Sequence, residues 1–143
     1  MSMTFEDLEA WQKARRLVND VYALSRNNPL ASDFGLCNQI QRAAVSVMSN
    51  VAEGFQRAHG GEKFQAYNIA RASCGEVRSL LYVIEDNYPS SASAAQHTRC
   101  LVDETGSLIS GLIASTRRRA AGKLGGEIAL LALMSWIGIH LIR

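Results

Sequence analysis

Apolar residues recur along most of this chain at alternating intervals of three and four, which is the spacing that places them on one face of an α-helix. The repeats predict four helices, over residues 4–26, 33–53, 62–87 and 91–116. Short connections that contain Asn, Pro or Gly separate these segments. Such a succession predicts an all-α fold, an antiparallel up-down four-helix bundle that occupies residues 1–119.

The repeat also predicts which side chains face the bundle interior. In the first two helices these are Leu8, Trp11, Ala14, Val18, Val21 and Tyr22, then Ile40, Ala44, Val47 and Val51. In the last two they are Tyr67, Ala70, Cys74, Val77, Leu81, Ile84 and Tyr88, then Ala94, His97, Leu101, Thr105, Leu108, Leu112 and Ser115. Gly75 interrupts the third helix at a cost of about 1 kcal/mol relative to alanine. We expect a close helix approach there.

Residues 120–143 fall outside the bundle pattern. The glycine-rich residues 120–126 predict a flexible or turning linker, and the apolar residues 128–142 predict an extra hydrophobic C-terminal helix. These fifteen residues would span about 22 Å as a helix, which is short of a hydrocarbon core of about 30 Å. A membrane anchor, favoured by the basic cluster before the tail, and a helix that packs on the bundle or between subunits both stay open.

A polar stripe runs beside the apolar face of the second helix. It comprises Arg42, Ser46, Ser49, Asn50 and Glu53, and Gly54 follows where a left-handed residue would close the helix. One interpretation is that these small polar residues lie at a close helix crossing, with Arg42 and Glu53 as an ion pair. The other is that the stripe forms a subunit or partner interface.

Charge is distributed unevenly along the chain. Residues 1–116 carry ten Lys and Arg against twelve Asp and Glu, a net −2, whereas residues 117–143 carry five against one, a net +4. The bundle therefore lacks the overall positive charge of a strong nucleic-acid binder. Three widely spaced cysteines predict reduced thiols rather than disulfides, and with the acidic N-terminal segment in place of a signal peptide they favour a cytoplasmic location.

No arrangement of catalytic residues emerges from the sequence. It has no Walker loop, no nucleophile elbow and no His-Glu-x-x-His motif, and Gly60–Gly61 lacks the lysine and hydroxyl of a phosphate-binding loop. His59, next to these glycines, is expected to be solvent-exposed. His97 and Cys100 share a helix face, but two ligands make a poor metal site. We expect a protein without enzymatic activity, cofactor or bound metal.

Three separated motifs resemble one known family. The hallmark of the 23S rRNA intervening-sequence proteins is matched by Arg42-Ala43-Ala44, Ser46, Ser49-Asn50 and Ala52-Glu53-Gly54. The opening segment from Phe5 to Ala14 resembles the start of that family's sequences, and Phe34-Gly35-Leu36 adds to the likeness. The likeness covers residues 4–116. Met48 stands where that family usually has proline, whose absence removes a cause of helix kinking and puts the family's assembly in question.

The resemblance implies a four-helix bundle that forms a homo-oligomer, a pentamer, and related bundles act as accessory subunits where nucleic-acid binding is implied. We therefore expect contact with structured RNA or a ribonucleoprotein. The candidate contact residues are Arg15, Arg16, Arg71, Arg78, Arg117, Arg118 and Arg119. The alternatives are an oligomeric protein-interaction scaffold without nucleic-acid binding, and a role at a membrane through the tail, which is less favoured.

Overall fold

The computed structural model describes residues 3–141, with side chains up to residue 126 and at residue 128. These residues form four α-helices and no strand, which confirms the all-α class. The helices are α1 (Glu9–Leu24), α2 (Phe34–Gln56), α3 (Gly60–Asn87) and α4 (Ala92–Leu141), with short 3₁₀ turns η1 (Phe5–Asp7), η2 (Leu30–Ser32) and η3 (Pro89–Ser91).

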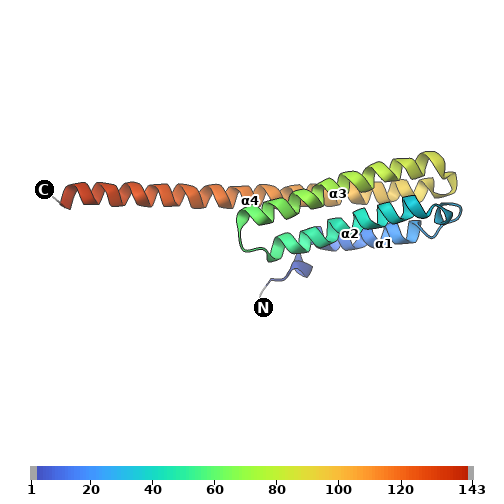
Figure 1. The fold of residues 1–143 in the computed structure, drawn as a ribbon, viewed down its shortest axis with the longest axis horizontal. Coiled ribbons are helices and arrows are strands. Elements are labelled where there is room, and N and C mark those ends of the chain that lie inside the picture. Colours follow the sequence, from blue (N-terminus) through green and yellow to red (C-terminus); the bar gives the residue numbers. More distant parts are fainter. Residues whose placement is uncertain (1–2, 142–143) are drawn as a thin grey trace.

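The helices lie side by side around one core. Each helix packs against the next along the chain, and α4 also packs against α1. The chain turns back at each connection, so that the α1–α2 and α3–α4 connections lie at one end and the α2–α3 connection at the other (Figure 1). At that second end, α4 continues beyond the other three helices (Figure 1).

The first α-helix begins five residues later than the sequence predicts. Thr4 does bond to the first turn, because its backbone N–H and its hydroxyl both donate to the Asp7 carboxylate, at 2.8 and 3.2 Å. This turn, however, is the 3₁₀ turn η1, and Leu8 follows with extended dihedral angles. The α-helix begins only at Glu9, and Gln12 reaches back to the Glu6 carbonyl to bridge the break.

Asp33 connects the two ends of the chain segment that forms α2 and α3. It lies just before α2 rather than in its first turn, and its Oδ1 accepts the backbone N–H of Leu36 at 3.0 Å. Its Oδ2 accepts the hydroxyl of Tyr88, which follows α3, at 2.7 Å. Both bonds favour the ionised carboxyl and lower the pKa of Asp33, the Tyr88 bond more strongly.

The predicted core faces of α2 and α3 are confirmed. All four apolar positions of α2 and the six from Tyr67 to Ile84 in α3 are buried, and Tyr88 packs partly against the core. In α1 the face is rotated, because Leu17 is fully buried while Tyr22 is 39% exposed. The inward assignment of Tyr22 was therefore wrong.

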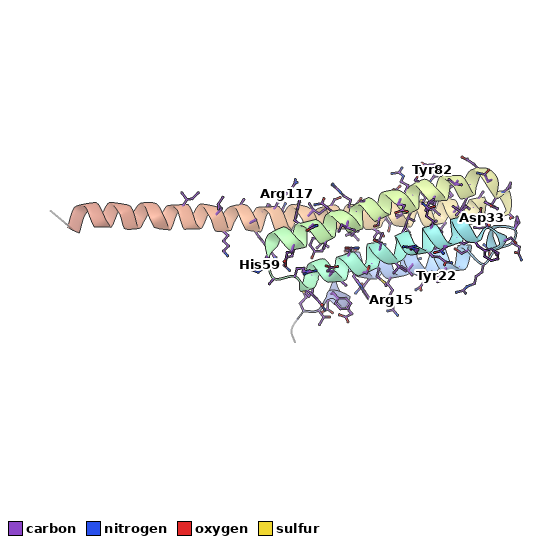
Figure 2. All side chains as sticks on the ribbon, in the orientation of Figure 1. Arg15, Tyr22, Asp33, His59, Tyr82 and Arg117 are labelled. Atoms are coloured by element: carbon purple, nitrogen blue, oxygen red, sulfur yellow. The ribbon has the colours of Figure 1, made fainter. Side chains whose placement is uncertain are left out.

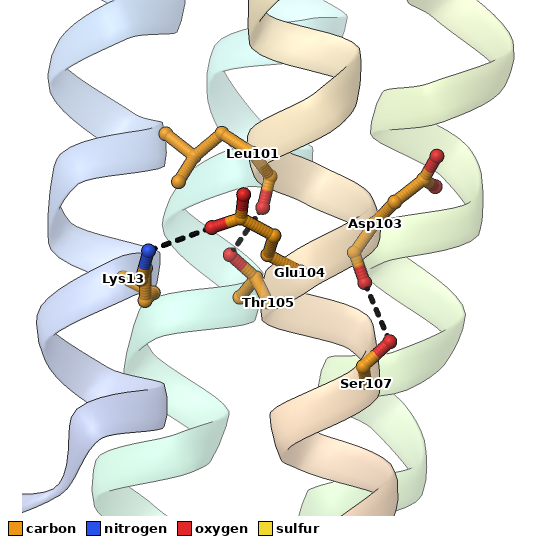
Figure 3. A network of polar contacts seen from close by, with 6 residues as sticks. All are labelled: Lys13, Leu101, Asp103, Glu104, Thr105 and Ser107. Carbon is orange, nitrogen blue, oxygen red and sulfur yellow. Dashed lines mark hydrogen bonds and ion pairs between the residues drawn. The ribbon is translucent and has the colours of Figure 1, made fainter.

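The predicted face of α4 is out of register in its first turns. Ala94 and His97 are exposed, and their neighbours Ala95 and Thr98 are buried. Buried threonine can occupy this face because its hydroxyl bonds within the helix: Thr98 Oγ1 donates to the Ala94 carbonyl at 2.9 Å. Thr105 does the same with Leu101 at 2.7 Å (Figure 3). A buried hydroxyl that is bonded in this way avoids most of the desolvation cost.

The predicted linker is not a separate element. Residues 120–126 are helical, and α4 runs through them without a break from Ala92 to Leu141. Gly122, Gly125 and Gly126 each weaken a helix by about 1 kcal/mol, but the segment contains no proline, and its other residues are good helix formers. The extra C-terminal helix is thus a continuation of α4, and the side chains of residues 129–142, on which the anchor hypothesis rests, lie outside the described ones.

Ion pairs join α4 to its two neighbours. Lys13 of α1 donates to Glu104 at 2.6 Å, and this bond lowers the pKa of Glu104 (Figure 3). Arg99 lies 3.4 Å from Glu85 of α3 and stacks over the Tyr82 ring at 4.4 Å. Both pairs are partly open to solvent, so each contributes at most about 1 kcal/mol.

Candidate nucleic-acid interface

The seven candidate arginines are all exposed, but they lie on three different helices. Arg15 and Arg16 belong to α1, Arg71 and Arg78 to α3, and the run of residues 117–119 to α4. Figure 2 labels one residue of two of these groups: Arg15 lies on the α1 side, and Arg117 lies where α4 leaves the bundle. The candidate residues therefore come from three helices, of which α3 and α4 pack against each other.

The α3 pair, Arg71 and Arg78, lies in a shallow cavity where the middle of α3 borders α4. Arg71 and Arg78 line it together with Gly75 and Asp103, and its volume is about 360 Å³. Arg78 lies 3.1 Å from the Asp103 carboxylate, and Arg71 donates to Asn68 at 3.3 Å. The charge of the α3 pair is therefore partly neutralised by Asp103, whereas Glu85 pairs with Arg99.

Gly75 is not a site of close helix approach. A Cβ atom built there meets nothing within 4 Å. The close approach is at Gly54 instead, which is helical and buried inside α2 rather than a left-handed terminal residue. A Cβ atom on Gly54 would lie 2.5 Å from Cε1 of the Tyr67 ring, so only glycine allows α3 to seat this ring against α2.

The polar stripe of α2 contributes one hydrogen bond to the crossing of α2 and α3. The hydroxyls of Ser46 and Ser73 lie 2.8 Å apart and share a hydrogen bond between α2 and α3. Asn50 donates to the carbonyl and to the hydroxyl of Ser46, at 2.9 and 3.2 Å. Ser49 donates to the Val45 carbonyl at 3.0 Å. Of these three residues only Ser46 bonds across to α3, whereas Asn50 and Ser49 bond within α2. A subunit or partner interface along the rest of the stripe stays a prediction.

The predicted pair between Arg42 and Glu53 is absent from the described part of the chain. Glu53 instead bonds Arg57, four residues further along, which raises the pKa of Arg57. Arg42 is exposed and lines a shallow cavity with Gln39 and Glu76. Because four residues make one turn of helix, Arg57 is within reach of Glu53, whereas Arg42 lies three turns away.

The run of arginines at 117–119 in α4, here called the α4 cluster, has cationic neighbours that were not among the predicted contact residues. Arg119 lines a cavity of about 490 Å³ with His59, Lys63 and Lys123, at the end of the bundle where the α2–α3 connection lies (Figure 2). Lys123 follows Arg119 by one helical turn, but Lys63 comes from α3. Its Nζ donates to the carbonyls of Gly54 and Phe55, at 3.3 and 2.9 Å.

The neighbouring arginine of this cluster is held by an aromatic ring. The guanidinium of Arg117 lies 4.7 Å from the centre of the Phe64 ring. Burial raises the pKa of Tyr67, and the charge of Arg119 opposes that rise, so Arg119 also acts on the first turns of α3. The cluster does not end α4, as the sequence predicted, because the helix continues past it.

His59 precedes α3 as an exposed residue, in agreement with the prediction. The connection around it is shorter than predicted, since it holds only residues 57–59 and Gly60 already begins α3. His97 and Cys100 are also exposed. Over the residues that the structure describes, no three His, Cys, Asp or Glu side chains gather as a metal site would require. Among the same residues, no helix is both long and apolar enough to span a membrane.

Comparison with known families gives a single assignment for most of the chain. The model of the 23S rRNA-intervening sequence protein family matches residues 6–111. This chain belongs to that family. The matched range contains α1 to α3, the first part of α4 and every residue of the hallmark motif, which confirms the predicted resemblance. A search of curated proteins found no match.

Proposed function

We propose that this protein is a non-enzymatic, antiparallel up-down four-helix bundle that assembles into a homo-oligomer, a pentamer, and contacts RNA or a ribonucleoprotein. Membership of the 23S rRNA-intervening sequence family supports a role connected with RNA. The serine hydroxyls at the crossing of α2 and α3 bond each other, as structural polar groups do, which suits a binding protein better than reaction chemistry.

The observation that carries the proposal is the cationic end of the bundle. Lys63 of α3 and Arg119 and Lys123 of α4 line one cavity there, and Arg117 and Arg118 precede Arg119 along α4 as exposed residues. RNA carries one negative charge per nucleotide, and cationic contacts to its phosphates supply sequence-independent affinity. Since residues 1–116 carry a net −2, binding should be confined to this end rather than spread over the molecule.

Assembly into a homo-oligomer is supported by apolar side chains that the single chain leaves exposed. Phe34 and Val45 of α2 are 80% and 37% exposed, and Ile69, Tyr82 and Val83 of α3 are 42–44% exposed. Copies of the cationic end in one assembly would contact the same RNA together. Such multivalency strengthens a weak single contact by orders of magnitude.

The test is binding of a fluorescent single-stranded RNA by the purified protein over a series of salt concentrations. Phosphate contacts predict an affinity that falls steeply as salt rises. Light scattering in the same buffer measures the mass of the assembly, and the ratio of ultraviolet absorbances detects nucleic acid that co-purifies. Absence of binding at the lowest salt concentration would refute the RNA proposal.

The exposed apolar side chains also support a second candidate, an oligomeric protein-interaction scaffold without nucleic-acid binding. Ile69 lies in a cavity between α2 and α3 that is also lined by Asn50 and Glu53 of the hallmark motif. Under this candidate, Ile69→Glu reduces the mass of the assembly, and neither the parent nor the variant binds RNA. An unchanged mass argues against an interface at this surface.

A further inference from the structure

The cavity at the cationic end has a more specific composition than a charged surface. It lies between the start of α3 and the part of α4 that leaves the bundle, and its volume is about 490 Å³. Lys63, Arg119 and Lys123 line it, and no Asp or Glu is among the described residues of its wall. We call it the α3–α4 cavity.

Lys63 is fixed in place but still has hydrogen-bonding capacity. Two of its three N–H donors are used by the carbonyls of Gly54 and Phe55, at the end of α2. The third donor is free for an acceptor in the cavity. A lysine that is already ordered loses less side-chain entropy when it binds a ligand than one that moves freely.

The opposite wall comes from α4. Arg119 and Lys123 are four residues apart, so both side chains lie on the helix face that borders the cavity. Both are exposed, and neither forms an ion pair within the described residues. Positive charge from two helices therefore converges on one space, without an acidic partner among the side chains that the structure describes.

The floor of the cavity also suits an anion. Gly60 and Gly61 form the first turn of α3, and a Cβ atom at either would meet nothing within 4 Å. The N–H groups of a first helical turn have no acceptor within the helix, and the absence of side chains lets a ligand approach them closely. These backbone donors add to the positive charge of Lys63, Arg119 and Lys123, which is the main attraction for an anion in this cavity.

We propose that the α3–α4 cavity binds backbone phosphate groups of RNA. This proposal rests on the proposed function and identifies the site of contact. The α3 pair is a weaker candidate because Asp103 lies 3.1 Å from Arg78 and offsets its charge. The α1 pair is weaker as well, since Glu104 lies near Arg16, and Arg15 stacks over the Trp11 ring. The α3–α4 cavity alone among these three has cations from two elements and no carboxylate in its described wall.

The test compares two variants that lose the same charge. Arg119→Gln with Lys123→Gln removes the α4 wall, and Arg15→Gln with Arg16→Gln is the control on α1. With a single-stranded RNA as probe, loss of two phosphate contacts reduces the salt dependence of log affinity by about 1.4 and the affinity near physiological salt by about tenfold. The control variant should bind as the parent does. Circular dichroism verifies that both variants fold.

Equal losses of RNA affinity in both variants would refute the cavity as the phosphate site, because they would indicate a diffuse charge effect. The proposed function would stand. If neither variant loses affinity, the cavity likewise fails. If the parent protein does not bind RNA at all, the proposed function fails and the inference with it. The three results are distinguishable in one set of salt titrations.

Two further probes separate other sources of negative charge. The backbone amide signals of Gly60 and Gly61 in nuclear magnetic resonance report occupation of the cavity directly. We expect RNA to shift them and added inorganic phosphate to compete. Shifts with inorganic phosphate but none with RNA would make this a site for free phosphate, and overturn the RNA assignment. Vesicles of anionic phosphatidylglycerol that bind the parent but not the Arg119/Lys123 variant, with RNA binding unchanged, would assign it to a membrane surface instead.

Discussion

Gly54 permits the sharpest test of how α2 and α3 pack. In Gly54→Ala the new Cβ atom would lie 2.5, 2.7 and 3.0 Å from Cε1, Cδ1 and Cζ of Tyr67. Carbon atoms in contact are about 3.5 to 4.0 Å apart, so the overlap is about 1 Å. The ring is 4% exposed and rigid, and must move into packed surroundings. Overpacking of this kind costs about 1–3 kcal/mol, and the contact of three ring atoms places it near the upper end.

Gly75→Ala is a matched control, because it makes the same change inside a helix where the Cβ atom meets nothing within 4 Å. Alanine should stabilise that helix by about 1 kcal/mol. The same gain applies at Gly54, which leaves a net loss of about 2 kcal/mol there. The difference between the two variants is therefore about 3 kcal/mol, and it isolates the cost of overlap with Tyr67.

Urea unfolding followed by circular dichroism measures this difference, at one protein concentration because the proposed assembly would contribute to stability. The parent and both variants should keep the same dependence on urea if they unfold in one step. Tyr67→Leu removes the ring, and in that background Gly54→Ala should lose most of its cost. Equal stability of the Gly54 and Gly75 variants would refute the claim that the Tyr67 ring requires glycine.

Three further predictions concern polar and ionisable groups. Ser46→Ala should destabilise the protein by about 1 to 2 kcal/mol in urea unfolding, since it leaves the buried Ser73 hydroxyl without its partner, and Ser73→Ala in addition should recover part of this. Tyr88→Phe should raise the pKa of Asp33, measured from its carboxyl carbon in nuclear magnetic resonance. Folding lowers that pKa, so the stability that it contributes is present above the unfolded pKa of about 3.9 and is lost as pH falls. The free energy of unfolding of the variant should therefore decrease less on acidification than that of the parent. Burial raises the pKa of Cys74 to about 12, so iodoacetamide at mildly alkaline pH should leave it unmodified in the folded protein and label it in urea, as peptide mass spectrometry would detect.

The sequence predicted the helices best where one apolar seam is continuous. The seam of α3 is regular over three heptads, and all six positions from Tyr67 to Ile84 are buried. The first turns of α4 lack such a signal, since alanine, serine and threonine occupy both faces. A threonine whose hydroxyl bonds the carbonyl four residues earlier behaves as a core residue, and a pattern of apolar letters cannot detect that.

The two misinterpreted glycines have a common cause. The position of Gly54 near the expected end of a helix suggested a left-handed cap, and that of Gly75 in a helix interior suggested a close approach. Whether a glycine is required depends on what lies across from it, and Tyr67 is thirteen residues away along the chain in another helix. Information of that kind is tertiary, and the helical repeat of a single segment does not contain it.

The candidate site illustrates the same limit for charge. The run of arginines at 117–119 was visible in the sequence, but Lys63 was not among the predicted contact residues. The two meet because α4 continues without a break and passes the start of α3. A flexible linker after residue 119, as predicted, would have left Lys123 without a fixed position beside Arg119.

The boundaries of the family match add a consequence for function. The match ends at residue 111, whereas Arg119 and Lys123 lie beyond it. Lys63, Gly60 and Gly61 lie within it, so the α3–α4 cavity joins a part that the family model covers to a part that it does not. Because α4 continues without a break from the matched range to Arg119 and Lys123, it holds these two charges beside the start of α3. The proposed RNA contact through this cavity therefore depends on the extended α4 of this chain, and would not follow from the four-helix bundle alone.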